Sequence, residues 1–305
     1  MIHEYLVSVR LMVYNHELYI REAIEGILKQ NTNFFVEVVI GDDFSTDKSL
    51  EIIREYKNTT NIHFKILERK VGDEYWHNRQ KLGRLHNFYN IIDNCRGKYI
   101  ALLDGDDYWT DPFKLQKQVD FLEANQDYAG SFHKIKAKVG LNLIEDTDIE
   151  MRYGKVIDKD KITRMDLLRE GNFIHSCSFM FRNKSFIFSE ELTQTPVGDI
   201  LFFLTICSNG YLKRIDDSMA VYRRGTGIYS SLSMVEMCKK KMQYQMCILS
   251  SLVDLNERKL FLKISLELIE HYEKIIRLDE KSIFSKKIDF LKILIHRFIL
   301  KIYKK

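Results

Sequence analysis

Two short acidic segments hold the side chains whose types and spacing best suit chemistry. The first, Gly41–Asp47, contains three aspartates, and the second, Asp104–Trp109, places three aspartates within four residues. Carboxylates this close together after an apolar stretch repel one another and lose hydration, so they need a cation or strong hydrogen-bond donors. Mg²⁺ and Mn²⁺ take oxygen ligands, few from protein and the rest from water and phosphates. The second segment therefore suits a metal that holds a nucleotide diphosphate, with another carboxylate on a ribose hydroxyl.

The same aspartates also have an ordinary structural explanation. Asp42, Asp43 and Asp47 can be turn or helix-cap residues, since aspartate favours both positions, and for Asp47 this is the better interpretation. For Asp104–Asp107 alone, a solvated turn is about as common as a metal site, because short acidic motifs match by chance. Two such segments on two strands of one parallel sheet favour the functional interpretation.

Three further residues could act on a bound diphosphate or on an acceptor. Asp199 stands alone at the start of an apolar segment, where it is either a general base or an ordinary N-cap. A base placed opposite the diphosphate contributes about 10²- to 10⁴-fold to the rate. Arg223 and Arg224 carry guanidinium groups that pair well with phosphate oxygens. The alternative for them is a solvent-facing basic pair after a strand.

The spacing of apolar residues indicates the strands and helices that must position these side chains. Apolar runs predict strands, and i, i+3, i+4 spacing predicts helices. The predicted strands are 5–14, 35–40, 62–67, 99–103, 128–139 and 172–182, and the predicted helices are 17–30, 45–56, 85–94, 113–125 and 196–209. Strands alternating with helices of this length predict an α/β fold with a mostly parallel sheet flanked by helices, whose ligands lie beyond the carboxyl ends of the strands. Both acidic segments follow predicted strands.

The chain is predicted to have two parts. Residues 1–230 form the main domain, within which 140–161 resist assignment, and residues 231–305 form a helical C-terminal region without glycine or proline. Residues 286–305 are rich in cations and have a broad apolar face. This pattern suits a helix lying on an anionic membrane surface, and it equally suits packing on the main domain or on a partner subunit.

Bulk properties narrow the class of protein. With 305 residues, 45% hydrophobic and 30% charged, the chain is typical of a soluble globular protein, and a net charge of +4 predicts no nucleic-acid role. Five scattered cysteines without a CxxC pair indicate a reducing compartment. We expect a cytoplasmic protein, with no signal peptide or membrane span, that contacts the inner face of the membrane if residues 286–305 bind lipid.

Three segments together resemble family 2 glycosyltransferases with the GT-A fold. They are Val7–Asn15, Gly41–Asp47 and Gly97–Trp109, and their order and spacing match over roughly the first 125 residues. The resemblance implies that Asp43 contacts a uridine-type base above the loop formed by Tyr14 and Asn15. It also implies that Asp104 lies near the ribose and that Asp106 holds Mn²⁺ or Mg²⁺ on the diphosphate.

The resemblance also implies that Asp199 is the catalytic base, with two departures nearby. Many members have Glu-Asp where this chain has Gly198 and Asp199, and members often carry a histidine where Gly225 stands. The contact from that histidine is therefore absent, and Arg223 or Arg224 would compensate for it.

The predicted function is an inverting, metal-dependent transfer of a sugar from a nucleotide sugar to a saccharide or lipid-linked acceptor, in building a cell-surface polysaccharide or glycolipid. A nucleotidyl- or phosphotransferase is one alternative, although it usually has a glycine-rich phosphate loop where this chain has Tyr14, Asn15 and His16. A nucleotide-sugar-binding protein without catalysis is another. The sequence leaves the donor sugar, the acceptor and the oligomeric state open.

Overall fold

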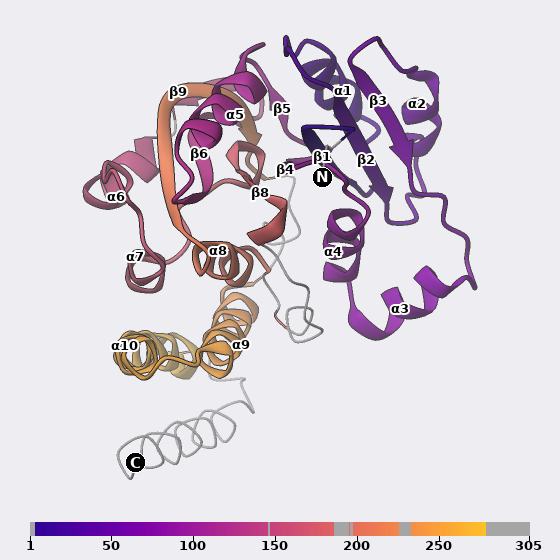
Figure 1. Ribbon diagram of the computed structural model, residues 1–305. Coiled ribbons are helices and arrows are strands. Elements are labelled where there is room, and N and C mark those ends of the chain that lie inside the picture. Colours follow the sequence, from indigo (N-terminus) through magenta and orange to yellow (C-terminus); the bar gives the residue numbers. More distant parts are fainter. Residues whose placement is uncertain (1–3, 146, 186–194, 196–197, 226–232, 279–305) are drawn as a thin grey trace. The chain divides into compact units, whose positions relative to one another are not determined.

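The computed structural model describes residues 4–145, 147–185, 195, 198–225 and 233–278 (Figure 1). The chain divides into two compact units. The first consists of Met1–Gln194 with Gly198–Thr226, and the second of Thr195–Val197 with Gly227–Lys305. The boundary predicted at residue 230 stays a prediction.

The first unit is built on one mixed sheet, whose strands follow the order β3-β2-β1-β4-β8-β6-β9-β5, with β7 paired to β6. Its N-terminal half is parallel and consists of β1 (Val7–Val13), β2 (Val36–Asp42), β3 (Ile62–Ile66) and β4 (Tyr99–Asp104). Strands covered by helices on both faces read as continuous apolar runs. This explains why β1, β2 and β4 were recognisable from the sequence.

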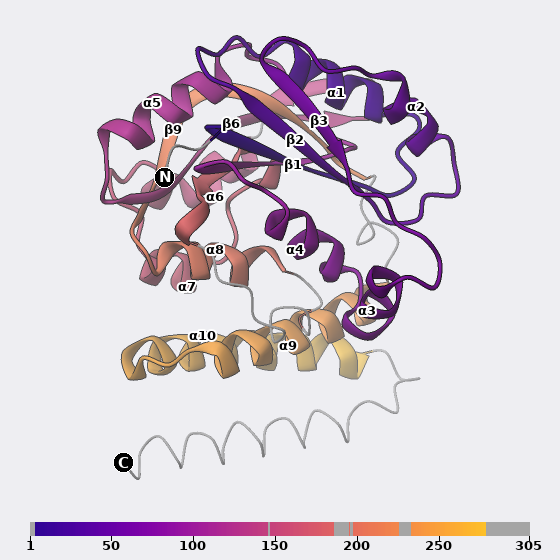
Figure 2. The same cartoon turned by 45° about the vertical axis from the view of Figure 1, so that its right-hand side comes forward.

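Helices cover both faces of this parallel half (Figure 2). α1 (Ile20–Leu28) and α2 (Ser49–Glu55) supply buried isoleucines to the hydrophobic core that also contains Val9 and Leu11 of β1. α4 (Leu85–Asp93) covers the other face. There Gly41 leaves the space that Ile91 and Asn87 occupy, since a Cβ at Gly41 would lie 2.4 Å from Ile91 Cγ1.

The C-terminal half of the sheet mixes strand directions. β6 (Tyr128–Val139) runs parallel to β9 (Tyr211–Arg223) and antiparallel to β8 (Met180–Arg182). The short strands β5 (Tyr108–Trp109) and β7 (Asn142–Glu145) pair antiparallel with β9 and β6. The accompanying helices are α5 (Lys114–Ala124), α6 (Thr147–Ile157), α7 (Arg164–Glu170) and α8 (Asp199–Cys207). The predicted α/β fold class is confirmed, with an all-parallel N-terminal part of four strands and a C-terminal part in which only β6 and β9 pair in parallel.

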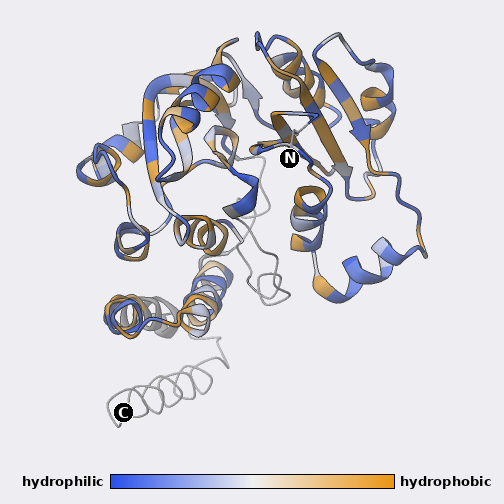
Figure 3. Cartoon of the chain, in the orientation of Figure 1, coloured by the Kyte–Doolittle hydropathy of each residue, from blue (hydrophilic) through white to orange (hydrophobic). Residues whose placement is uncertain are grey.

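Three of the differences between the sequence predictions and the structure have a clear physical reason. The strand expected over 172–182 is only β8, because residues Ser176–Ser178 form a 3₁₀ turn that precedes it. α3 (Glu74–Leu82) was missed because it buries none of its residues and has no apolar stripe (Figure 3). The Asp73 carboxylate caps this helix by accepting from the Trp76 N–H at 2.7 Å. β9 was not delimited, since charged residues interrupt its apolar pattern.

The second unit contains α9 (Met234–Ser251) and α10 (Leu255–Leu278). A reciprocal cap between Ser233 and Glu236 starts α9, and Ser265 of α10 donates to Gln245 of α9 at 2.9 Å. The helical C-terminal region is thus confirmed for the described residues. None of the described helices has the length and apolarity needed to cross a membrane. The contact predicted for residues 286–305 lies outside the described part.

Candidate active site

The backbone of β1 draws both acidic segments to one edge of the sheet. The Asp43 N–H donates to the carbonyl of Val13 at 2.9 Å. The Gly105 N–H donates to the carbonyl of Met12, the residue before Val13, at 2.8 Å. In the strand register, Val13 pairs with Asp42 and Met12 pairs with Asp104. Neighbouring strands lie about 4.8 Å apart, so the two acidic strand ends flank β1 within about 10 Å of each other. This is the edge where a parallel sheet binds ligands.

The loop after β1 is joined to the loop after β2 through Asn15. Asn15 adopts a left-handed backbone conformation with φ of 54°, which asparagine tolerates better than most residues. Its side-chain Oδ1 accepts from the Thr46 N–H at 2.8 Å, and its own N–H donates to Ser45 Oγ at 2.9 Å. Tyr14, beside it, is 50% exposed. The nucleotide contacts predicted for Tyr14 and Asn15 stay predictions, and the structure assigns Asn15 a clear role in shaping the loop.

Two of the predicted turn aspartates do shape turns. Asp42 accepts from both the backbone N–H and the hydroxyl of Ser45, at 2.9 and 2.5 Å. Asp47 accepts from the Ser49 N–H at 2.9 Å in the turn before α2, whose N-cap position is Lys48, so Asp47 has the turn role and not the cap role.

Asp43 is held by two side chains of α3. Arg79 Nε forms an ion pair with Asp43 Oδ2 at 2.8 Å, and the Tyr75 hydroxyl donates to Oδ1 at 2.9 Å. Burial raises the pKa of Tyr75, with the Asp43 charge adding to the shift, so the phenol stays a donor. The Tyr75 ring also lies between Phe44 and His86, with centroids 5.9 and 5.1 Å away. The carboxylate predicted to contact the base is therefore held by a tyrosine that packs against other aromatic rings, and sequence reasoning missed Tyr75.

Asp104 is held by Arg10, a residue that sequence reasoning also missed. Arg10 is fully buried in β1, and its Nη1 lies 2.5 Å from Asp104 Oδ1. Its guanidinium lies 4.6 Å from the centre of the Phe88 ring on α4. Ser176, in the 3₁₀ turn, donates to Asp104 Oδ2 at 3.0 Å. An arginine within an otherwise apolar strand was the signal in the sequence, because such a cation requires a buried anionic partner.

The rest of the second acidic segment is tied to β9. Asp107 is buried and accepts from the Arg223 N–H at 2.9 Å, so it binds the backbone of β9 and does not cap a helix. Burial raises the pKa of Asp107 well above its usual range, and the Asp106 charge adds to this. The Arg223 guanidinium donates to the Asp106 carbonyl and pairs with Glu22 of α1. Asp106 itself is partly exposed.

Asp199, the candidate base, is the first residue of α8. Burial raises the pKa of its carboxyl, and the Asp104 charge raises it further, whereas Arg10, Arg84 and His175 oppose the shift. Asp199 and Asp104 are therefore close enough to interact electrostatically. Gly198 also has a local explanation, because a Cβ there would lie 2.9 Å from Leu85 Cδ2. Leu85 thus fills the space that a glutamate at residue 198 would need.

The described residues allow a metal site in which phosphates and water supply most of the ligands. No group of three or more His, Cys, Asp or Glu side chains among them is arranged to hold an ion. A cation would therefore need most of its ligands from elsewhere, as Mg²⁺ and Mn²⁺ do when phosphates and water supply the oxygens. Asp106 offers a hard carboxylate ligand at the sheet edge, and the neighbouring carboxylates are held by Arg10 and by the backbone of Arg223. The donor set fits a metal that arrives with a diphosphate.

This architecture, with acidic loops at the carboxyl edge of a half-parallel sheet, defines a GT-A type of α/β protein. The sequence model of the family described as Glycosyl transferase family 2 matches residues 8–187, and the chain belongs to that family.

Two relatives illustrate the match in sequence. The uncharacterized protein Rv1520 of Mycobacterium tuberculosis is 32% identical over 225 residues, which cover 73% of this chain and 60% of the relative. The putative teichuronic acid biosynthesis glycosyltransferase TuaG of Bacillus subtilis is 33% identical over 118 residues, covering 38% of this chain and 42% of TuaG. The chain thus spans less than two thirds of the length of these relatives.

Solved structures confirm the fold. S. aureus TarS in complex with UDP superposes with a TM-score of 0.58 and 19% identity, over 84% of this chain and 70% of that one. The mannosyltransferase PcManGT from Pyrobaculum calidifontis, in complex with GDP-Man and Mn²⁺, gives a TM-score of 0.59 and 16% identity, over 89% and 72% of the two chains.

Proposed function

We propose that this chain is an inverting, metal-dependent glycosyltransferase that moves a sugar from a nucleotide sugar, a UDP-sugar in our interpretation, to an acceptor hydroxyl. One observation carries the proposal. Consecutive residues of β1 accept hydrogen bonds from both acidic segments, and Asp199 lies within the electrostatic reach of Asp104. This arrangement supports a site in which Asp43 contacts the base, Asp104 contacts the ribose and Asp199 accepts the proton. TarS with UDP and PcManGT with GDP-Man and Mn²⁺ support this interpretation through their shared fold.

In this mechanism each carboxylate has a separate task. Asp43, fixed by Arg79 and Tyr75, contacts the base, and Asp104, fixed by Arg10, contacts the ribose. A divalent ion bound to Asp106 would neutralise the charge that develops on the leaving diphosphate. Asp199 accepts the proton of the acceptor hydroxyl as its oxygen attacks the anomeric carbon from the face opposite the diphosphate.

The raised pKa of Asp199 suits a base, because a carboxylate with a higher pKa takes up a proton more readily.

The two arginines at the end of β9 would act differently. Arg223 packs between the rings of Tyr19 and Tyr108, 4.8 and 4.9 Å from their centres, and would act indirectly by holding the Asp106 loop. Arg224 is partly exposed and is the better candidate for a direct contact with the diphosphate. The name of TuaG supports a role in cell-surface polysaccharide synthesis, with a saccharide or lipid-linked acceptor.

A donor screen tests the proposal. Hydrolysis of UDP-, GDP- and dTDP-sugars would be measured with Mg²⁺ or Mn²⁺, alongside calorimetric titration of UDP with and without metal. We expect metal-dependent UDP binding and slow UDP release from one donor. Binding without turnover would indicate a nucleotide-sugar-binding protein instead, and turnover of a nucleoside triphosphate with a sugar phosphate would indicate a nucleotidyltransferase.

A further inference from the structure

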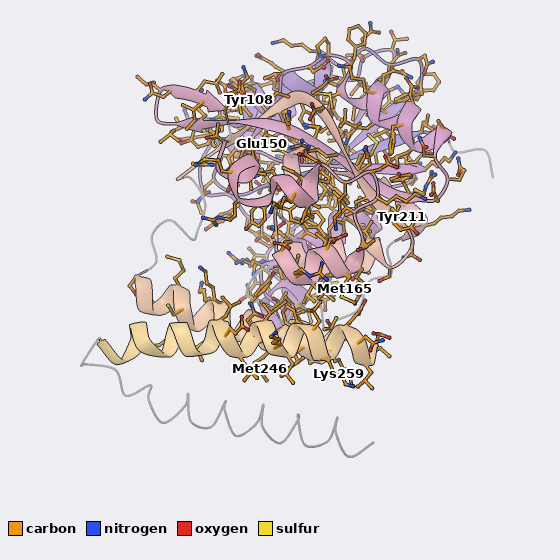
Figure 4. All side chains as sticks on the ribbon, turned by 90° about the vertical axis from the view of Figure 1, so that its left-hand side faces the viewer. Tyr108, Glu150, Met165, Tyr211, Met246 and Lys259 are labelled. Carbon is orange, nitrogen blue, oxygen red and sulfur yellow. The ribbon has the colours of Figure 1, made fainter. Side chains whose placement is uncertain are left out.

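A cavity of about 140 Å³ lies in the C-terminal half of the first unit. Its wall is formed by β6, by Glu145 of β7, by α6, by Arg214 of β9 and by the segment from Phe173 to His175. Part of this wall, from Glu145 to Glu150, comes from residues 140–161, which the sequence left unassigned. Figure 4 labels Glu150, one of the α6 residues that line the cavity.

The cavity adjoins the catalytic carboxylates through His175. This residue lines the cavity, and the next residue, Ser176, donates to Asp104 at 3.0 Å. The His175 ring lies 4.6 Å from the ring of Tyr222, and the charge of His175 acts on Asp199. Tyr222 in turn has a pKa raised by burial and by Asp107, Asp106 and Asp104. His175 thus joins the wall of the cavity to the residues around Asp104.

The chemistry of the wall indicates an uncharged ligand. Arg214 pairs with Glu150 at 2.5 Å and with Asp158 at 2.6 Å. Lys134 pairs with Asp216 at 2.9 Å. Burial lowers the pKa of His133 well below its usual range, so this imidazole is neutral. The charges are therefore largely balanced within the wall, and the cavity does not suit a second phosphate group.

The shape and polarity of the wall narrow the ligand further. Phe132, Ile135 and Phe173 supply an apolar floor, while Thr147 and Glu150 supply hydrogen-bonding groups. A cavity of roughly 150 Å³ holds one six-membered ring. Binding sites of this kind combine apolar walls with a few placed polar groups. A pyranose ring has the same combination, with apolar C–H faces and hydroxyls at its edge.

We propose that this cavity binds the acceptor, as one uncharged pyranose ring whose free hydroxyl reaches Asp199 past His175. The inference rests on the proposed function, because it assigns the second substrate of the same reaction. It also gives β7 and α6 a role, because residues of both elements complete the cavity wall.

The test fills the cavity from its exposed side. Thr147→Trp and Ile149→Trp place an indole on α6, and Leu141→Trp, at a position that is 99% exposed between β6 and β7, is the matched control. Binding of methyl β-D-glucopyranoside, methyl β-D-galactopyranoside and methyl N-acetyl-β-D-glucosaminide would be followed by saturation-transfer NMR with UDP and Mg²⁺ present. Circular dichroism would verify that each variant is folded.

We expect at least one glycoside to bind the wild type and Leu141→Trp, and its signal to fall at least tenfold in both filled variants. UDP affinity should stay within twofold in all four proteins. Failure of every glycoside to bind the wild type, or undiminished binding in the filled variants, overturns the acceptor site. Loss of UDP binding in the wild type would instead refute the proposed function, so the two failures are distinguishable.

Discussion

Replacing Arg10 tests whether a buried cation holds the carboxylates of the site together. Arg10→Met keeps most of the aliphatic length of the side chain and its contact with Phe88, and it removes the ion pair with Asp104. Methionine fills irregular space well, so little cavity cost is added. The variant therefore isolates the electrostatic part of the interaction.

The expected loss of stability follows from burial. Removing one partner of a buried ion pair costs about 3–5 kcal/mol, because the remaining charge is left uncompensated. The Arg10 side chain is 0% exposed and that of Asp104 is 23% exposed, so water can partly solvate the orphaned carboxylate. We therefore expect the free energy of unfolding to fall by about 3 kcal/mol, the lower end of this range. With a urea dependence of about 3 kcal/mol per molar, the unfolding midpoint should fall by about 1 M.

The assay is urea unfolding at pH 7, with Arg21→Met as the control. Arg21 pairs with Glu55 at 2.8 Å, but both side chains are half exposed, and the midpoint of this variant should not move measurably. Equal midpoints for the wild type and Arg10→Met would refute the reasoning.

The same variant should change the pH dependence of turnover. Arg10 opposes the upward shift in the pKa of Asp199, so its removal raises that pKa further. Because the base works when ionised, turnover rises as pH increases through this pKa. The acidic limb of the kcat profile should therefore move to higher pH in Arg10→Met and stay unchanged in Arg21→Met.

Three further variants probe the site and its frame. Asp106→Ala should abolish metal-dependent UDP binding in calorimetry with little change in Tm, since it removes a ligand; unchanged affinity would exclude the metal role. Asp199→Asn should retain UDP binding while donor turnover falls by about two orders of magnitude or more. A carboxyl whose pKa is raised in the native state destabilises the protein as pH rises above the pKa of the unfolded state, so Asp199→Asn should also be more stable than the wild type at pH 7. Near-normal turnover of this variant would place the base elsewhere. Gly26→Ala would bring a Cβ within 2.8 Å of the Trp109 carbonyl oxygen and should cost about 1–3 kcal/mol in urea unfolding, and an unchanged midpoint would show that the helix can shift freely.

The sequence by itself determined the fold class, the family and the parallel half of the sheet. Strands β1, β2 and β4 are apolar along their length because helices cover both of their faces, and such runs are visible without coordinates. The position of the acidic segments directly after β2 and β4 was readable for the same reason. α8 was predicted because its residues are almost wholly apolar.

Only the tertiary structure decided which groups stabilise the carboxylates. Arg10 and Asp104 are 94 positions apart, and Tyr75 and Asp43 are 32 apart. Neither pairing leaves a periodic pattern, because each joins single residues from different elements. The contact between Asp107 and the backbone of β9 likewise joins residues 116 positions apart. The cavity beside His175 depends in the same way on where β7 and α6 pack, since a wall made from several elements exists only after they have packed together.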